Sequence, residues 1–161
     1  HDIFTYYPGN GFSKNSVAKT QTICLDSRKY NTVAYNIDDN NYFKLRDIAQ
    51  ILNGTIKTFD VKYDGATNSI DMLSFYDYTS VGGELTPGDD VTRTAFSSSA
   101  FLTLDGVPIK ATCYNIDGNN YFKLRDITDA LDCRVEWDDN NQLIWVVPSV
   151  PAYDDPNEAV G

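Results

Sequence analysis

Histidine is almost absent from this chain of 161 residues. The only one, His1, stands at the very start of the sequence. Histidine-based catalysis and histidine-ligated zinc or copper both need imidazoles that a scaffold holds in place. A lone terminal histidine therefore argues against both, and we expect no cofactor and no bound metal.

Positive charge is also scarce. Lys and Arg together number 13 against 23 Asp and Glu, which gives a formal net charge of −10 and a pI near 4.3. Nucleic acids and anionic membranes bind clustered Lys and Arg, so this balance argues against both as partners. No apolar run approaches the ~20 residues of a membrane span, and no signal peptide opens the chain, so we expect no membrane insertion. The abrupt start, HDIF, suggests a segment of a longer protein.

Cysteine is limited to Cys24, Cys113 and Cys133, and no two of them have CxxC spacing. A thiolate metal site is therefore not expected. Cys113 and Cys133 lie on either side of one predicted helix and could form a disulfide in an extracellular protein. The alternative is that all three are small buried apolar residues.

The chain does contain a repeated block. YNIDDNNYFKLRD, beginning at Tyr35, returns as YNIDGNNYFKLRD, beginning at Tyr114, with Asp39 replaced by Gly118 as the one difference. The similarity extends in both directions. TICLDSRKYNTVAYNID aligns with FLTLDGVPIKATCYNID at a shift of 79 residues, and VKYDGATNSIDM aligns with VEWDDNNQLIWV at a shift of 74. An internal repeat of two copies indicates two similar small units.

Each copy shows the same order of predicted elements. In the second copy, FLTL at 101–104 is a short strand, Asp-Gly follows as a hairpin turn, and PIKATCYNI at 108–116 is a longer strand. The strands CRVEWD and QLIWVV come after a helix. The helix is predicted from apolar spacing at i, i+3, i+4 and i+7, in the first copy by Leu45, Ile48, Ala49 and Leu52 and in the second by Leu124, Ile127, Thr128 and Leu131. The expected fold class is thus α+β: two tandem β-β-α-β-β units, each a small twisted, mostly antiparallel sheet packed on one helix.

The expected boundaries follow from the repeat and from composition. A connector rich in Gly, Ser, Thr and Asp separates the copies, and its aromatic residues suggest that part of it packs. The predicted segments are an N-terminal extension (1–21), the first repeat (22–73), the linker (74–100), the second repeat (101–147) and a flexible C-terminal tail (148–161).

These motifs resemble a known family. AYNIDDNNYFKLRDIA, FDVKYDGATNSIDM, TSVGGELTPGD and the second YNIDGNNYFKLRDI with VEWDDNNQLIWV are similar to the bacterial stalk domain, also called the copper amine oxidase N-terminal-like domain. The resemblance covers 22–147, and the tandem NYFKLRD signature is typical of secreted proteins of Gram-positive anaerobes. It implies a module outside the cell, fused to enzymes or surface proteins. It implies no catalytic residue, because the metal and quinone of copper amine oxidases belong to another domain.

The repeated block has two interpretations, a structural one and a ligand-binding one. Asn-Asn suits a turn, and the aromatic and leucine residues suit a strand that enters a helix. The residues assigned to this structural motif are Tyr42, Phe43, Leu45, Arg46, Asp47, Tyr121, Phe122, Leu124, Arg125 and Asp126. The Arg-Asp pairs are expected on the polar side of each helix start, where the carboxylate favours the helix dipole. Lys44 and Lys123 are identical without an evident structural reason: they either bind an acidic partner or cover apolar surface with their stems.

The sequence offers three further candidate sites. The acidic turns offer oxygen ligands, but none has the length of a dedicated calcium loop. Acidic residues are plentiful, yet nothing marks a pair of carboxylates for glycoside hydrolysis. The last strand offers an aromatic surface: if Ile144 faces the core, then Leu143 and Trp145 point the other way, and with Tyr76 or Tyr78 they could stack on sugar rings. Burial of that face against IFTYYPG or the linker tyrosines is the alternative.

The sequence therefore predicts a module without enzymatic activity, extracellular and either secreted or cell-wall associated. Its expected role is to space, orient or attach neighbouring domains of the same polypeptide. The alternative is a glycan- or cell-wall-binding module, with polysaccharide or peptidoglycan bound around Trp145.

Overall fold

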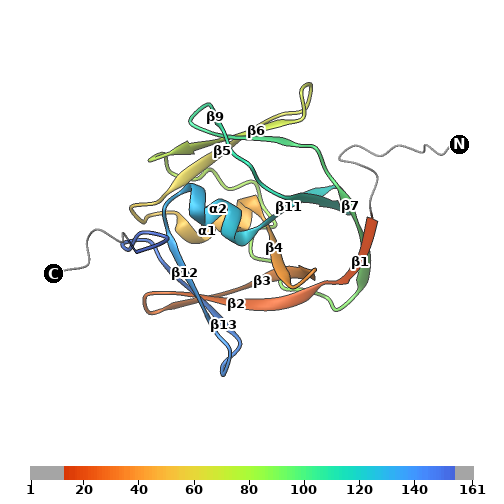
Figure 1. The fold of residues 1–161 in the computed structure, drawn as a ribbon, viewed down its shortest axis with the longest axis horizontal. Helices are drawn as coiled ribbons and strands as arrows, with labels where there is room; N and C mark the ends of the chain where they lie inside the picture. The colour runs from red at the N-terminus through yellow and green to blue at the C-terminus, as the bar shows by residue number, and fades with distance from the viewer. Residues whose placement is uncertain (1–12, 155–161) are drawn as a thin grey trace, which may run out of the picture.

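The computed structural model describes residues 13–154. His1, the segment IFTYYPG and the end of the predicted tail, 155–161, lie outside the described residues. Within that range the chain forms thirteen strands and two helices (Figure 1). The helices are α1 (Leu45–Leu52) and α2 (Leu124–Ala130). The strands are β1 (Ser13–Val17), β2 (Lys19–Leu25), β3 (Arg28–Ile37), β4 (Asn40–Lys44), β5 (Phe59–Asp64), β6 (Ser69–Ser74), β7 (Thr92–Ser97), β8 (Phe101–Leu104), β9 (Val107–Pro108), β10 (Cys113–Ile116), β11 (Asn119–Lys123), β12 (Arg134–Asp138) and β13 (Leu143–Val147).

The strands belong to two sheets. The nine-stranded sheet has the order β1-β7-β10-β11-β4-β3-β2-β13-β12, and the four-stranded sheet has the order β5-β6-β8-β9. The predicted α+β fold of two tandem β-β-α-β-β units, each with its own small sheet, is therefore wrong. The described chain is mostly strand, and both sheets contain strands from both copies. Side-chain alternation identifies a strand and its buried face, but it does not say which strand lies beside it.

The two copies exchange their last hairpins. The β5–β6 hairpin of the first copy joins β8 of the second copy in parallel, with Ile70 opposite Leu102. The β12–β13 hairpin of the second copy joins β2 of the first copy in parallel, with Ile144 opposite Ile23. These two registers are equivalent under the sequence shifts of 79 and 74 residues. The copies are thus interlocked by the same strand pairing made twice.

An approximate two-fold axis passes between β4 and β11. These strands pair antiparallel with Phe43 opposite Phe122, so a residue of one copy faces its own equivalent in the other. Two equivalent aromatic contacts flank this pair. The Tyr35 ring packs edge-on against Tyr121 with centroids 5.0 Å apart, and the Tyr42 ring packs against Tyr114 at 5.1 Å. The aromatic residues of the repeated block therefore hold one copy against the other.

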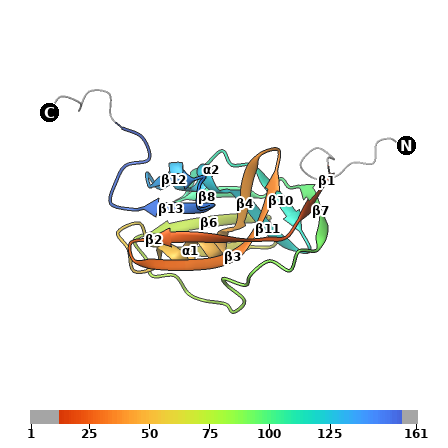
Figure 2. The same ribbon diagram turned by 90° about the horizontal axis from the view of Figure 1, so that it is seen from below.

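The helices lie in the middle of the molecule, between β5–β6 on one side and β2–β3 on the other (Figures 1 and 2). The predicted helices and their apolar stripes are confirmed, since all eight stripe positions are buried. Each helix covers apolar residues of both sheets in one common core. Neither helix in the described range is long and apolar enough to cross a membrane.

The segment PIKATCYNI is not one strand. It contains the end of β9 and all of β10, with 109–112 outside any strand. β9 belongs to the four-stranded sheet and β10 to the nine-stranded sheet, so the chain changes sheet between them. The equivalent part of the first copy is the single ten-residue strand β3.

The predicted linker contributes to the fold. Its end forms β7, which pairs with β1 and with β10. Before β7, the backbone of 86–91 follows β2 and β3: Val33 N–H donates to the carbonyl of Thr86 at 2.9 Å, and Asp90 N–H donates to that of Ala18 at 2.8 Å. Gly88 lies so close to this backbone that an added Cβ would stand 2.4 Å from the carbonyl oxygen of Ala18.

The one substitution in the repeated block lies in a hairpin turn, as predicted. Asp38 and Asp39 have φ of 52° and 66°, and their equivalents Asp117 and Gly118 have φ of 51° and 86°. Two consecutive residues of positive φ are the requirement of a type I′ turn, which Gly meets at no cost and Asp tolerates. The backbone is therefore the same in both copies, and only a side chain is gained or lost.

Candidate functional site

Two clefts occupy equivalent places on the two copies. The first cleft, about 650 Å³, is lined by the start of α1, the β5–β6 hairpin and the turn end of the β10–β11 hairpin. The second cleft, about 840 Å³, is lined by the start of α2, the β12–β13 hairpin, part of β2 and the turn end of the β3–β4 hairpin. Each cleft thus combines the helix start of one copy with the repeated turn of the other. The exchange of hairpins and the β4–β11 pairing create both clefts.

An exposed aromatic ring stands in each cleft at the same position. Tyr63 on β5 is 57% exposed and lines the first cleft, and its equivalent Trp137 on β12 is 43% exposed and lines the second. Apolar side chains lie beside each ring: Ile70 in the first cleft and Ile144 in the second. The first cleft is also lined by Phe96 of β7, which is 41% exposed and has no equivalent in the second. A concave apolar lining with an accessible aromatic ring is typical of small-ligand sites.

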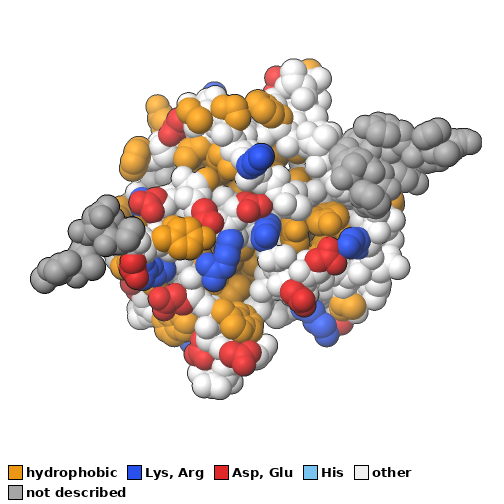
Figure 3. Space-filling view, viewed as in Figure 1, with side chains coloured by type: hydrophobic (Ala, Val, Ile, Leu, Met, Phe, Trp, Pro, Cys, Tyr) orange, Lys and Arg blue, Asp and Glu red, His pale blue; other side chains and the backbone are white. Residues whose placement is uncertain are grey.

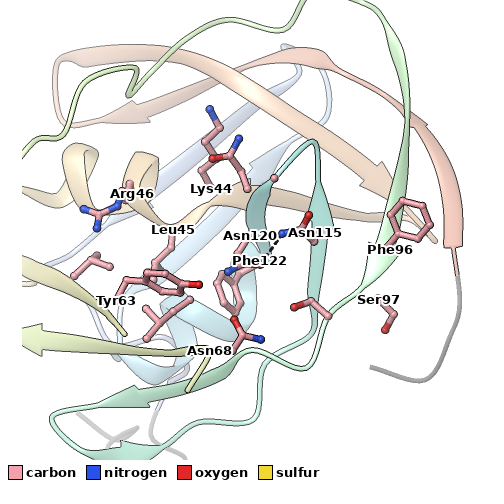
Figure 4. A pocket seen from close by; sticks show the side chains of 15 residues that line it. Lys44, Leu45, Arg46, Tyr63, Asn68, Phe96, Ser97, Asn115, Asn120 and Phe122 are labelled. Atoms are coloured by element: carbon pink, nitrogen blue, oxygen red, sulfur yellow. Dashed lines mark hydrogen bonds between the residues drawn. The ribbon is translucent and has the colours of Figure 1, made fainter. Parts of the chain in front are cut away.

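Amide side chains form the wall that the other copy supplies. In the first cleft Asn115 Nδ2 donates to Asn120 Oδ1 at 3.3 Å, and in the second Asn36 Nδ2 donates to Asn41 Oδ1 at 3.2 Å. Each of these bonds uses one N–H and one oxygen, so each pair keeps further donors and acceptors. Figure 4 shows Asn120, Phe122 and the ring of Tyr63 together at one end of the first cleft.

The charged residues of the clefts are mainly cations. Lys44 and Arg46 line the first cleft, which has no carboxylate in its lining. Their equivalents Lys123 and Arg125 line the second cleft together with Lys19. Lys and Arg side chains also stand over the middle of the face drawn in Figure 3, with Asp and Glu around them. These four repeated cations form no ion pair within the described residues, whereas Lys19 lies 3.6 Å from Asp90.

The position that differs between the repeated blocks lines both clefts. Gly118 lies in the lining of the first cleft, and Asp39 is the one carboxylate in the lining of the second. Nothing stands within 4 Å of a Cβ added at Gly118. The first cleft therefore has room for the side chain that the second cleft carries.

The four residues predicted as an aromatic platform are not brought together. Ile144 is buried as predicted, and Trp145 on the opposite face of β13 is 36% exposed. Trp145 lies between Cys24 of β2 and Glu136 of β12 and lines neither cleft. Leu143 is half-buried and lines the second cleft. Tyr76 is exposed but lines neither cleft.

Tyr78 is a core residue and cannot offer its ring to a ligand. Its side chain is 6% exposed, and its hydroxyl donates to Glu84 at 2.5 Å and accepts from Arg46 at 3.3 Å. Burial raises the pKa of Tyr78 to about 12. Burial alone would raise the pKa of Glu84 as well, but hydrogen bonds from Tyr78 and from backbone N–H groups lower it to about 2. This group ties the linker to α1.

Seven of the ten residues assigned to the structural motif are buried: Tyr42, Phe43, Leu45, Asp47, Tyr121, Phe122 and Leu124. Arg46 is half-buried, Arg125 is exposed, and both line a cleft. Both Asp-containing helix starts are confirmed, since Asp47 and Asp126 lie in the first turns of α1 and α2.

The expectation that Asp47 lies on a polar helix face is wrong, because its side chain is 1% exposed. Asp47 accepts hydrogen bonds from Thr32 Oγ1 at 2.7 Å and from Leu85 N–H at 2.9 Å. Burial raises the pKa of Asp47, although these two hydrogen bonds act in the opposite direction. Its equivalent Asp126 accepts a single backbone bond, from Thr112 N–H at 2.8 Å.

Metal and thiol chemistry find no support in residues 13–154. This part of the chain has no group of three His, Cys, Asp or Glu side chains arranged to hold a metal ion. Cys24, Cys113 and Cys133 are free and buried, so the disulfide considered between Cys113 and Cys133 is not formed. Burial raises the pKa of the Cys113 thiol to about 12 and that of Cys133 to about 11, which leaves both poor nucleophiles.

Sequence reasoning missed Tyr63 and Trp137 as site residues. The signal was present: these two aromatics align with each other, whereas Trp145 aligns with Asp71. An aromatic that both copies keep at an exposed strand position is a better candidate than one that a single copy has. The adjacent asparagines, Asn40-Asn41 and Asn119-Asn120, are expected in a turn, but they begin β4 and β11 and line a cleft.

Comparisons with known proteins return no match. No protein-family model, no curated protein and no solved structure matches the chain. The resemblance to the stalk domain stays a prediction.

Proposed function

We propose that this chain is a non-catalytic attachment module of a larger extracellular protein, secreted or cell-wall associated, and that it attaches by binding a glycan in its two clefts. The observation that carries the proposal is the equivalence of the clefts: the same aromatic, amide and cationic residues recur in both, and each set comes from both copies. Core packing alone explains the buried residues of the repeated block. It does not explain why the exposed ones are kept as well.

The chemistry of the linings supports binding without turnover. Glycoside hydrolysis uses two carboxyl groups that flank the scissile bond. No carboxylate lines the first cleft, and Asp39 stands alone in the lining of the second. An exposed ring beside amide groups can hold a sugar by stacking and by hydrogen bonds to hydroxyls, and neither interaction breaks a covalent bond.

The arrangement of the chain also supports a spacer role, with the neighbouring domains of the same polypeptide as partners. The described chain starts in β1 at one side of the molecule and ends after β13 at the other (Figures 1 and 2). A module of this shape can stand in series between two domains. The resemblance to the stalk domain implies the same role.

The test is retention on insoluble polysaccharide and on peptidoglycan. The variant with Tyr63→Ala and Trp137→Ala removes the exposed ring that the two clefts have at the equivalent position, and Trp145→Ala removes an exposed ring outside both clefts. We expect the parent and Trp145→Ala to be retained and the double variant to be lost, with all three showing the same melting temperature. Retention that survives the double variant, or that disappears with Trp145→Ala alone, would refute binding in the clefts. If the parent is not retained on any polymer, only the spacer role remains.

A further inference from the structure

We propose that both clefts select saccharides that carry a carboxylate, and that Asp39 makes the second cleft the weaker of the two for such ligands. This inference rests on the proposed function, since it names the ligand class of the clefts described above. It adds that the ligand is negatively charged and that the two clefts differ in their affinity for it. Neither follows from attachment alone.

The charge of the linings is the first argument. The chain as a whole has a net charge of −10. Against that background the first cleft is lined by two cations and no carboxylate, and the second by three cations and one carboxylate. Because Asp90, outside the lining, lies 3.6 Å from Lys19 and offsets its charge, the second cleft has one uncompensated positive charge and the first has two. A cationic site in an acidic surface attracts an anionic group.

The repetition of these cations is the second argument. Lys44 and Arg46 recur as Lys123 and Arg125, and none of the four forms an ion pair within the described residues. Lys44 and Lys123 are also the residues that the structural interpretation of the block did not explain. A ligand carboxylate gives both lysines a partner.

The remaining lining favours a saccharide over an acidic peptide. A sugar presents a ring face to an aromatic side chain and presents hydroxyls, each both donor and acceptor, to amides. Tyr63 with the Asn115–Asn120 pair, and Trp137 with the Asn36–Asn41 pair, offer both features side by side. An extended acidic peptide would instead pair its backbone with a free sheet edge, and the cleft walls named here are side chains.

The difference between the clefts is a single side chain. Asp39 and Gly118 occupy the same turn position with positive φ, and each lines one cleft. The Asp39 carboxylate offsets one of the cations that would meet the ligand. Exchange of the two residue types should be tolerated by the fold, because Gly adopts φ of 66° freely and Gly118 has open space around an added Cβ.

The test is calorimetric titration with galacturonic acid pentasaccharide and, as the neutral match, galactose pentasaccharide. The clefts are separated by silencing one of them: Tyr63→Ala leaves the second cleft, and Trp137→Ala leaves the first. Asp39→Gly is then made in the Tyr63→Ala background, and Gly118→Asp in the Trp137→Ala background. The melting temperature of every variant is measured to confirm that it is folded.

We expect the acidic sugar to bind more tightly than the neutral one. Its affinity should fall as the salt concentration rises from 20 to 200 mM, because salt screens exposed charges. Asp39→Gly should raise the affinity of the second cleft for the acidic sugar by about three- to tenfold, which is the effect of one charge at a partly solvated site. Gly118→Asp should lower the affinity of the first cleft by a similar factor. Equal affinity for both sugars, or no change on either exchange, would overturn the inference while leaving attachment intact. Tighter binding of a glutamate pentapeptide than of the acidic sugar would overturn the saccharide class. If neither sugar nor peptide binds, both the inference and attachment through the clefts fail.

Discussion

Replacing Gly88 with alanine should destabilise the whole fold, although Gly88 lies in the predicted linker. A Cβ at this position would stand 2.4 Å from the carbonyl oxygen of Ala18 and 2.4 Å from the carbonyl carbon of Lys19. Both are backbone atoms of β2 or its approach, so no side chain can turn away. The segment would have to move by about 1 Å to reach an ordinary contact of 3.4 Å. That shift disturbs the bonds from Gly88 N–H to Thr20 Oγ1 (2.9 Å) and from Asp90 N–H to the carbonyl of Ala18 (2.8 Å).

The expected cost follows from those contacts. These two hydrogen bonds, each with a net contribution of about 0.5–1.5 kcal/mol, give about 1–3 kcal/mol of lost unfolding free energy. For a chain of this length that corresponds to a melting temperature lower by about 2–12 °C. Gly65→Ala is the matched control, because its added Cβ would stand 3.4 Å from its nearest neighbour, the Tyr63 ring, which is an ordinary contact. Urea unfolding followed by circular dichroism measures both variants. A Gly88→Ala variant within about 0.5 kcal/mol of the parent would refute the close packing of 86–91 against β2.

Two further perturbations test the core. Phe43→Leu and Phe122→Leu should each cost less than the roughly 3–5 kcal/mol of a Phe→Ala truncation. Because these residues are opposite each other across β4–β11, their costs should be non-additive by about 0.5–3 kcal/mol in urea unfolding, and additive costs would contradict the interlocked fold. Asp47→Asn tests the buried carboxylate. Burial raises the folded-state pKa of Asp47 above its unfolded value, so the stability contributed by this group is present below about pH 4 and is lost as pH rises through the raised pKa. The variant should therefore gain stability relative to the parent between pH 4 and pH 7, and a constant or falling difference would show that Asp47 is not destabilised by burial.

The sequence allowed the local elements to be predicted and not the way they assemble. The helical stripes of α1 and α2 and the presence of a turn at Asp39 and Gly118 depend on neighbouring residues, and the structure confirms them. The parallel pairings of β2 with β13 and of β6 with β8 join residues far apart in the chain. Alternation along β13 shows that Ile144 is buried, but the same pattern fits pairing of β13 with strands of either copy. The predicted self-contained units failed for that reason.

The same limit applies to the residues around the site. Asp47 and Asp126 belong to identical NYFKLRD blocks, yet Asp47 is bonded to Thr32 and to the linker residue Leu85, while Asp126 is bonded to backbone alone. Position 32 aligns with Ala111 in the second copy, so the hydroxyl partner exists once. Identical sequence therefore does not guarantee identical roles when the surrounding segments differ.

The repeated block is both a structural element and, on our proposal, a binding one, because its side chains divide between two environments. Tyr42 and Phe43 are buried and join the copies, whereas the asparagines before them and Lys44 after them reach a cleft. The division follows position along β4, since the middle of the strand is buried and its two ends lie at the clefts. The asparagines of each block line the cleft whose helix start comes from the other copy. Each block therefore contributes to both clefts, to one through its turn and to the other through its helix start, which is a reason for the two blocks to stay nearly identical. Asp39 and Gly118 differ at the one place where the backbone accepts either residue and where the change acts on a cleft.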